Sequence, residues 1–541
     1  MTGVSRVPEP RNEPVLSYAP GTPERAQILA ALETLSSERP SIPLVIGDDR
    51  ITAPSVDVVM PHAHRHVIAR ASSATPAQVK SAIEAAEAAR PQWSALSFES
   101  RAAILLRAAD LVTGKYRAKI NAATMLGQSK TVHQAEIEAA CEHADFFRFN
   151  VAFADELRRE QPLSVPGMWN RVELRPLDGF VFAISPFNFT AIAGNLPTAP
   201  ALMGNTTVWK PAPQQMYGAH VTMEILQEAG MPPGVINLVA GDPAMIGDIC
   251  LKDPRLAGVH FTGSTKTFQH IHKVVGENIA SYRQYPRIVG ETGGKDFIFA
   301  HPSADVDALA IACLRGAFEY QGQKCSAASR VYVPKSIWKP LKERLVPMVE
   351  SIPMGDIRDL SNFMGAVIDQ RAFDKISGYI ERGKADAEVT LLAGGQCDQS
   401  EGWFVRPTVF ETSNPKHELV TEEIFGPVVT FVPYEDKKMD EALELCDRST
   451  PYGLTGAIFS EDRYATEQMA ARLRNAAGNF YINDKPTGAV VGQQPFGGSR
   501  ASGTNDKAGS PANLMRWVSV RTIKETFVHP TDWRYPFMAS E

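Results

Sequence analysis

Short apolar runs separated by helix-like stretches organise this chain from Val172 onward. The runs at 179–184, 206–209 and 235–239 are rich in β-branched and aromatic residues, which favours strands, and a helix is expected over 216–229. Strands that alternate with helices predict a parallel, doubly wound sheet, because parallel neighbours need long crossover connections. Each run ends at a polar or glycine-containing turn, and ligands of such sheets bind beyond the carboxyl ends of the strands.

The same pattern restarts after Glu291. Six further runs read as strands, at 296–300, 331–333, 389–392, 428–432, 456–459 and 479–482. A chain of 541 residues is also too long for a single core. Residues 518–527 alternate like an edge strand, which oligomers often bury against a partner. We predict an α/β fold with two doubly wound parallel-sheet domains and a small β flap.

Composition excludes several classes of protein. The hydrophobic share of 44% and the charged share of 21% are globular values, and the net charge of −6 indicates neither nucleic acid nor an anionic membrane. No apolar run approaches the ~18 residues of a membrane span. The six cysteines are scattered, which fits a reducing compartment better than a disulfide framework. We expect a soluble, cytoplasmic protein.

The first residues, 1–21, are rich in proline and read as an extended arm without the apolar core of a targeting segment. Thr22-Pro23-Glu24 then predicts a helix start, with a capping hydroxyl, a proline in the first turn and an acid beside it. Thr75-Pro76 repeats this signal, and helical pattern continues from 100 to about 153.

His62, His64 and His66 alternate along one predicted strand. Alternation would place the three imidazoles on one face, where they could bind zinc or copper. Without a carboxylate or cysteine nearby to complete the site, we interpret them as a polar strand face and expect no metal.

Cys325 is the candidate nucleophile. It follows a helix predicted over 305–318 and lies in the polar stretch YQGQKCSAASR, whereas most free cysteines are small core residues. Thiol catalysis needs an accessible sulfur, a lowered pKa and backbone N–H groups near the reacting carbon. Glu291, in VGETGGKD, adds a carboxylate beside two glycines, which is unusual in a plain strand.

With these motifs the chain resembles the aldehyde dehydrogenase superfamily over most of its length. The resemblance implies that Cys325 is the nucleophile and Glu291 the general base. Asn188, in SPFNF, matches the residue that donates to the oxyanion. It further implies a Rossmann-like NAD-binding domain (1–156 and 177–290), a catalytic domain (291–500) and an oligomerisation flap (157–176 and 515–541).

The resemblance also implies an NAD site, although the chain has no convincing GxGxxG motif. The implied cofactor-binding residues are Ser185, Lys210, Gly241, Gly263, Ser264, Glu423 and Phe425. Gly263-Ser264 follows a strand and opens a helix, so its N–H groups could meet a pyrophosphate. The family often has a second glycine five positions further on, where this chain has Phe268. Pro213 replaces the glutamate common in NAD-preferring members, so we expect NAD with measurable NADP use.

Residues 483–509 most resemble the 1-pyrroline-5-carboxylate (L-glutamate γ-semialdehyde) dehydrogenases within that superfamily. The implied substrate-binding residues are Phe189, Ser326, Gly488, Ala489 and Phe496. Backbone N–H groups at a glycine-containing turn can form an anion nest for the substrate α-carboxylate. The alternative interpretation is that Gly488 and Ala489 belong to an ordinary loop and that Phe189 and Phe496 make core contacts.

The sequence therefore predicts an NAD-dependent oxidation of L-glutamate γ-semialdehyde to L-glutamate, the second step of proline catabolism. The alternatives are an aldehyde dehydrogenase for another carboxylated aldehyde, such as succinate semialdehyde, or a non-catalytic cofactor-binding protein. As partners we expect a second copy of the chain in a homodimer or larger homo-oligomer, and possibly a separate proline dehydrogenase.

Overall fold

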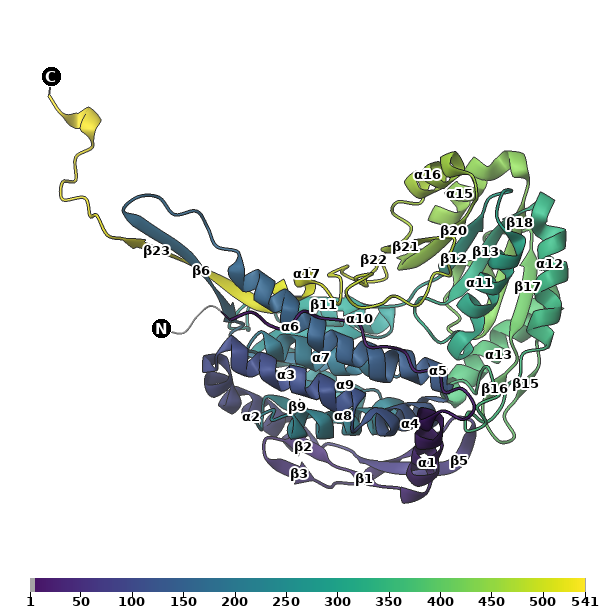
Figure 1. Ribbon diagram of the computed structural model, residues 1–541, viewed down its shortest axis with the longest axis horizontal. Coiled ribbons are helices and arrows are strands. Elements are labelled where there is room, and N and C mark those ends of the chain that lie inside the picture. The colour runs from purple at the N-terminus through teal and green to yellow at the C-terminus, as the bar shows by residue number, and fades with distance from the viewer. Residues whose placement is uncertain (1–4, 541) are drawn as a thin grey trace.

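The computed structural model describes residues 5–540, and two seven-stranded sheets form its framework (Figure 1). The first sheet has the order β11 (Arg287–Glu291), β10 (Leu256–Thr262), β7 (Phe180–Ile184), β8 (Thr206–Lys210), β9 (Ile236–Leu238), β2 (Leu44–Ile46) and β3 (Asp49–Ile51). Its first five strands are parallel, as the strand–helix alternation predicted. The hairpin of β2 and β3 joins antiparallel to β9 and was not predicted, because strands of three residues carry little pattern.

The second sheet lies on the other side of the molecule, at the right in Figure 1. Its order is β14 (Val389–Ala393), β17 (Thr408–Thr412), β18 (Val428–Tyr434), β13 (Ala328–Pro334), β12 (Asp296–Ala300), β20 (Thr455–Phe459) and β21 (Asn479–Ile482). Only the edge strand β14 is antiparallel to its neighbour. The chain is thus an α/β protein with two parallel-sheet units, which confirms the predicted fold class.

The parallel register brings the predicted polar motifs to one edge of the first sheet. Ile184 is paired with Lys210 between β7 and β8, and Thr262 with Glu291 between β10 and β11. These are the last residues of their strands. β8 is buried along its whole length, so a ligand can meet only its carboxyl end at Lys210 and the residues beyond it.

Helices pack on both sides of the first sheet and around the second. The helices are α1 (Pro23–Glu38), α2 (Pro76–Ala95), α3 (Phe98–Thr113), α4 (Arg117–Gln128), α5 (Val132–Ala135), α6 (His143–Arg159), α7 (Thr190–Leu202), α8 (Met216–Glu228), α9 (Pro243–Lys252), α10 (Thr265–Glu277), α11 (Val306–Phe318), α12 (Lys335–Glu350), α13 (Gln370–Ala385), α14 (Glu418–Thr421), α15 (Met439–Arg448), α16 (Arg463–Arg472) and α17 (Pro511–Met515). A π-helix, η1 (Glu136–Glu142), precedes α6. None of the helices within residues 5–540 is long and apolar enough to span a membrane.

Shorter elements complete the described chain. They are the three-stranded sheet β1 (Ser41–Ile42), β5 (Ala63–Ser72), β4 (Ser55–Met60); the pairs β15 (Cys397–Asp398) with β16 (Phe404–Val405) and β19 (Tyr452–Gly453) with β22 (Ser499–Arg500); and the 3₁₀ turns η2 (Pro213–Gln215), η3 (Glu319–Gly322), η4 (Asp436–Lys438) and η5 (Pro536–Met538). The signal at Thr75 is a full capping box with Gln78. Thr22 precedes α1 as predicted, but its hydroxyl donates to Ala19 O at 2.9 Å instead of capping the helix.

The three histidines do not share one environment. His62 is buried and contacts Ser129 Oγ at 3.1 Å, His64 contacts Gln399 O at 2.9 Å, and His66 contacts Ser36 O at 2.7 Å. The predicted common polar face is therefore wrong, because His62 lies in the turn before β5 and points into the core. Within the described part of the chain, no three histidine, cysteine or acidic residues are placed to hold a metal ion.

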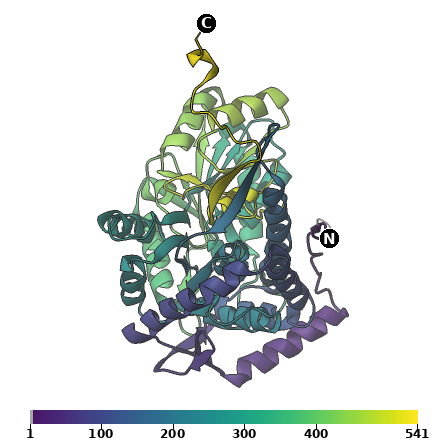
Figure 2. The same ribbon diagram turned by 90° about the vertical axis from the view of Figure 1, so that its left-hand side faces the viewer.

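A two-stranded antiparallel ribbon extends from the first sheet unit, at the upper left in Figure 1. It pairs β6 (Met168–Pro176) with β23 (Val518–Thr526) over the whole length of both strands. Beyond it, the C-terminal residues run away from the body in both views (Figures 1 and 2) and expose aromatic side chains, among them Trp533 and Phe537. Both strands are otherwise unpaired within residues 5–540.

A buried amide fixes the base of this ribbon. Asn205 Oδ1 accepts from Leu177 N at 2.9 Å, and its Nδ2 donates to Trp517 O at 2.8 Å and Pro200 O at 2.9 Å. Leu177 follows β6 and Trp517 precedes β23, so one side chain holds both strands at their point of exit.

We expect Asn205→Ala to lower the free energy of unfolding by about 3 kcal/mol, because it leaves two buried backbone groups, the Leu177 N–H and the Trp517 carbonyl, without partners. A thermal unfolding scan of the purified protein measures the change as a lower Tm. Asn170→Ala is the matched control, since Asn170 donates to Leu163 O in an exposed part of the ribbon. Equal Tm values for the two variants would contradict this role of Asn205.

Candidate active site

The loop that carries Cys325 follows α11 through a sharp reversal. Asp305 caps α11 by accepting from Ala308 N at 2.8 Å. After the helix ends, Tyr320, Gln321 and Gly322 adopt left-handed φ values of 50°, 54° and 62°. The chain then turns back toward β13 and leaves Cys325 half-buried at the turn.

A cavity of about 440 Å³ opens at Cys325. Seven of the predicted site residues line it: Cys325, Glu291, Phe189, Ser326, Gly488, Ala489 and Phe496. They come from β11, from the starts of α7 and β13 and from the loop 483–498. The structure therefore brings the predicted nucleophile and base together with all five predicted substrate-binding residues.

The environment of the thiol is acidic. Burial, together with the carboxyl groups of Asp296, Glu291 and Glu423, raises the pKa of Cys325 above its ordinary value. This direction is opposite to the lowered pKa that the sequence interpretation required of the Cys325 thiol. The neighbouring Lys324 is engaged elsewhere, because its Nζ pairs with Glu319 at 3.0 Å.

Glu291 ends β11 with its carboxylate against a glycine turn. Its Oε2 accepts from Gly498 N at 2.9 Å. Burial raises the pKa of Glu291 well above its ordinary value, while the Gly498 N–H and the Lys507 ammonium act in the opposite direction. A raised pKa makes the Glu291 carboxylate a stronger base than an exposed glutamate, as the role of general base requires.

Asn188 lies in the loop between β7 and α7, and its side chain is buried. Nδ2 donates to Gln323 O at 3.0 Å, which places the amide beside the loop that carries Cys325. A primary amide has a second N–H, and the backbone N–H of Cys325 donates to none of residues 5–540. The site thus holds two donors that could meet an oxyanion.

The predicted cofactor-binding residues of the first domain lie at the carboxyl edge of the first sheet, outside the 440 Å³ cavity. Ser185 Oγ accepts from Trp209 Nε1 at 2.9 Å, and Gly241, with φ of 137°, lines a second cavity of about 430 Å³. Lys210 is buried at the end of β8. Its burial lowers its pKa to about 8, although the Asp242 carboxylate acts in the opposite direction.

Gly263 and Ser264 form the turn before α10. The Gly263 N–H already donates to Glu291 O at 3.2 Å, so it is not free for a phosphate. Ser264 caps α10 by accepting from Thr267 N at 3.2 Å, and the N–H groups left for an anion are those that open this helix. Phe268 stacks on Phe261 with ring centroids 5.4 Å apart and fills the core beneath the turn.

Glu423 and Phe425 reach the site from the second domain. Glu423 Oε1 accepts from Gly294 N at 2.9 Å, which ties its loop to the segment after Glu291. Phe425, at φ of 60°, meets Phe187 edge to face with centroids 5.9 Å apart. Phe187 belongs to the same loop as Asn188, so aromatic rings from both domains meet next to the proposed oxyanion donor.

The predicted carboxylate nest has free donors. Gly488 adopts a φ of 96°, and the backbone N–H groups of Gly488 and Ala489 donate to none of residues 5–540. Ser326 Oγ contacts Thr487 Oγ1 at 2.8 Å, which holds the nucleophile loop against the nest. Both N–H groups belong to residues that line the same cavity as Cys325.

Sequence reasoning missed a group of buried charges in the cavity wall. Lys130 Nζ pairs with Glu138 Oε1 at 2.8 Å and lies over the rings of Phe189 and Tyr320 at 4.2 and 4.6 Å. Glu142, one turn after Glu138, also lines the cavity, and burial raises its pKa to about 8. In the sequence these acids look like a solvated helix face, and only the packing of the π-helix reveals their burial.

Comparison with known proteins gives a consistent result. The family model described as "Aldehyde dehydrogenase family" matches residues 50–523. The chain is 50% identical to a Dictyostelium discoideum protein named delta-1-pyrroline-5-carboxylate dehydrogenase, mitochondrial, over 99% of this chain and 96% of that one.

Two solved structures extend the comparison. A Mycobacterium tuberculosis delta-pyrroline-5-carboxylate dehydrogenase bound with NAD matches with a TM-score of 0.97 and 55% identity over 100% of both chains. A proline utilization A structure from Bdellovibrio bacteriovorus matches with a TM-score of 0.92 and 31% identity, over 97% of this chain and 54% of that one.

In the ligand-free protein we expect iodoacetamide to modify Cys325 slowly at about pH 7.5 and faster as the pH rises, because the raised pKa keeps the thiol protonated. Mass spectrometry of the digested protein measures the rate. Cys397, half-buried in the distant β15–β16 hairpin, is the internal reference. A rate at Cys325 that is already high and independent of pH would reveal a preformed thiolate and contradict this prediction.

Proposed function

The chain belongs to the aldehyde dehydrogenase family, and from this premise we propose that it oxidises L-glutamate γ-semialdehyde to L-glutamate with NAD as cofactor. One observation carries the proposal. A single cavity contains the Cys325 thiol and the unbonded backbone N–H groups of Gly488 and Ala489. An aldehyde with a carboxylate at its far end would use both.

In the proposed reaction the Cys325 thiolate attacks the aldehyde carbon, and the C=O oxygen becomes an alkoxide. The second N–H of Asn188 and the N–H of Cys325 donate to that oxygen. NAD, when bound, supplies the acceptor for the hydride that leaves the carbon. Water then attacks the carbonyl carbon of the resulting thioester, Glu291 takes a proton from that water, and the sulfur of Cys325 leaves as thiolate as the carbon–sulfur bond breaks.

Both ends of the substrate find complementary groups. Ser326, Gly488 and Ala489 supply donors for the α-carboxylate, and Phe189 and Phe496 supply apolar walls for the aliphatic carbons. The α-ammonium would face the acidic wall that Glu142 forms, where the positive charge favours the ionised carboxylate. Succinate semialdehyde has no ammonium to meet this wall.

The residues at the sheet edge fit a dinucleotide. Lys210 and Ser185 provide side-chain donors for ribose hydroxyls, and the opening turn of α10 after Gly263-Ser264 suits a pyrophosphate. Glu423 has one carboxylate oxygen left to accept from the nicotinamide ribose, and the Phe425 ring would contact the nicotinamide. Gly241 would line the part of the site that holds the adenosine.

We further propose that residues 1–156 and 177–290 hold the cofactor, residues 291–500 carry the nucleophile, and residues 157–176 with 515–541 form an oligomerisation flap. The open edges of β6 and β23 and the exposed aromatic side chains after them support a homo-oligomer. The match to a protein named proline utilization A supports a link between this activity and proline oxidation as the source of the substrate. The expected cytoplasmic location stays a prediction, since the Dictyostelium relative is named mitochondrial.

The substrate assignment is tested by kcat/KM for L-glutamate γ-semialdehyde and for pentanal, which matches it in chain length. We expect the wild-type enzyme to prefer the semialdehyde by about a hundredfold, a net gain of about 3 kcal/mol from charge-assisted hydrogen bonds after desolvation. Ser326→Ala should reduce this ratio by about tenfold and leave pentanal little changed. Ser81→Ala, on the exposed face of α2, is the matched control. Equal kcat/KM for the two aldehydes in the wild type would refute the assignment.

Glu291→Gln tests the hydrolytic step. We expect the variant to give a normal burst of reduced cofactor and then turn over about 100-fold more slowly or worse, because no base activates water. Rapid kinetics measures the burst, and mass spectrometry of the quenched protein detects the acyl group on Cys325. Because the pKa of Glu291 is raised, wild-type hydrolysis should accelerate as the pH rises, and the variant should lose that dependence. A variant without burst or acyl group would assign Glu291 to an earlier step.

A further inference from the structure

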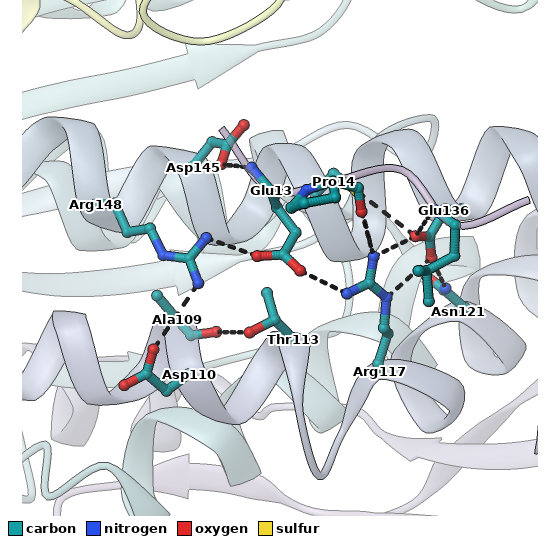
Figure 3. Close-up of polar contacts among 12 residues, drawn as sticks. Glu13, Pro14, Ala109, Asp110, Thr113, Arg117, Asn121, Glu136, Asp145 and Arg148 are labelled. Atoms are coloured by element: carbon teal, nitrogen blue, oxygen red, sulfur yellow. Dashed lines mark hydrogen bonds and ion pairs between the residues drawn. The ribbon is translucent and has the colours of Figure 1, made fainter. Parts of the chain in front are cut away.

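The N-terminal arm, residues 5–22, is fixed along α6 and η1 by a charge network (Figure 3). The Glu13 carboxylate lies between two guanidinium groups, with Arg117 Nη1 at 2.6 Å and Arg148 Nη1 at 2.8 Å. Arg117 also donates to Pro14 O at 2.8 Å and pairs with the buried Glu136. These groups are shielded from solvent, so their attraction is screened less than that of a surface pair.

Asn12, the residue before this network, connects the arm to a distant loop. Its Nδ2 donates to Asp145 Oδ2 at 2.8 Å on α6 and to Val491 O at 2.8 Å. Its Oδ1 accepts from Gln493 Nε2 at 2.9 Å. The adjacent Glu13 N donates to Asp145 Oδ1 at 2.8 Å. All the hydrogen-bonding groups of the Asn12 side chain are therefore used between α6 and residues 491–493.

That loop is the one that carries the proposed carboxylate nest. Ala489 is followed two residues later by Val491, whose side chain is buried with Phe146 and Ala191. Gly492, at φ of 83°, lies against α6 so closely that a Cβ there would be 2.1 Å from Phe149 Cε1. A displacement of the loop at 491–493 would therefore be transmitted directly to the N–H groups of Gly488 and Ala489.

Asn12 and Glu13 also line the cavity that contains Cys325. The arm thus forms part of the cavity wall. Through the hydrogen bonds of Asn12 it also contacts the loop of the carboxylate nest, at residues that follow the substrate donors Gly488 and Ala489. Two backbone N–H groups that converge on one anion must be held in place, because a nest that fluctuates loses its alignment with the carboxylate.

We propose that the N-terminal arm, through Asn12, is a positioning element that fixes residues 487–493 and thereby sets the preference for aldehydes with a carboxylate over uncharged ones. This inference rests on the proposed function. Asn12 acts through the loop, whereas Gly488 and Ala489 contact the substrate.

The test compares Asn12→Ala with the wild type and with Arg11→Ala. Arg11 is the neighbouring arm residue, and its exposed side chain makes no hydrogen bond or ion pair among residues 5–540. We expect Asn12→Ala to raise KM for L-glutamate γ-semialdehyde by about tenfold, the equivalent of one lost hydrogen bond to the carboxylate. Its kcat, and kcat/KM for pentanal, should change less than about twofold, and Arg11→Ala should equal the wild type.

Hydrogen exchange of the ligand-free variants gives a readout that does not depend on the substrate. We expect faster amide exchange in the peptide covering 487–493 of Asn12→Ala, with unchanged exchange in the peptide of Cys325.

The outcomes separate the two proposals. A wild-type enzyme without preference for the semialdehyde overturns the proposed function. A wild-type preference that Asn12→Ala leaves intact, or unchanged exchange at 487–493, overturns the role of the arm alone. Loss of both activities together with a large drop in Tm would also overturn it, because the arm would then only stabilise the fold.

Discussion

The reversal of the chain before Cys325 is the constraint on which the site depends. Tyr320 and Gln321 have left-handed φ values, which cost about 1–3 kcal/mol each for residues with a Cβ. The amide of Gln321 stabilises the turn by donating to Ser129 O at 2.9 Å and to Ala366 O at 2.7 Å. These two carbonyls belong to different domains, so the nucleophile is held in place only when both domains are assembled around it.

Gly322 completes this turn for a steric reason. A Cβ at this position would lie 2.3 Å from Gly426 O, in the loop that also carries Glu423 and Phe425. Tyr320 in turn packs against Lys130. A buried pair such as Lys130–Glu138 rarely adds stability over apolar residues, because both charges lose their hydration. The contacts of Lys130 to Phe189 and Tyr320 instead connect the start of α7 with the turn that precedes Cys325.

Local sequence pattern predicted the parallel strands well, because β7, β8, β12 and β20 are buried apolar runs bounded by turns. It could not predict the short strands β2 and β3, because β2 is placed by pairing with β9 and β3 by pairing with β2. Residue type and setting drew attention to Cys325 and Glu291, and the Gly488-Ala489 turn was implied by the family resemblance. They could not indicate the raised pKa of the Cys325 thiol, which arises first from burial and then from carboxyl groups far apart in the chain.

The same limit explains what was missed in the cavity wall. Glu138 and Glu142 have the spacing of a solvated helix face. The adjacent sequence contains no signal that predicts the π-helix, which turns both side chains toward the interior. Asn12 lies in a proline-rich arm that looks unstructured by composition, although its partners are on α6 and beyond residue 490. A long-range contact made by a single polar residue produces no periodic pattern in the sequence, so it cannot be predicted from such a pattern.

The pairing of β6 with β23 also has a consequence for biosynthesis. The two strands are about 350 residues apart in the chain, so β23 is translated long after β6. At ribosomal rates, β6 leaves the tunnel roughly 20–70 s before its partner exists. During that interval the edge of β6 is open. The Trp517 carbonyl, which accepts from the Asn205 side chain in the folded protein, has not yet been made. The ribbon can therefore form only once residues 518–526 have been translated, and until then the open edge of β6 can pair with another nascent chain.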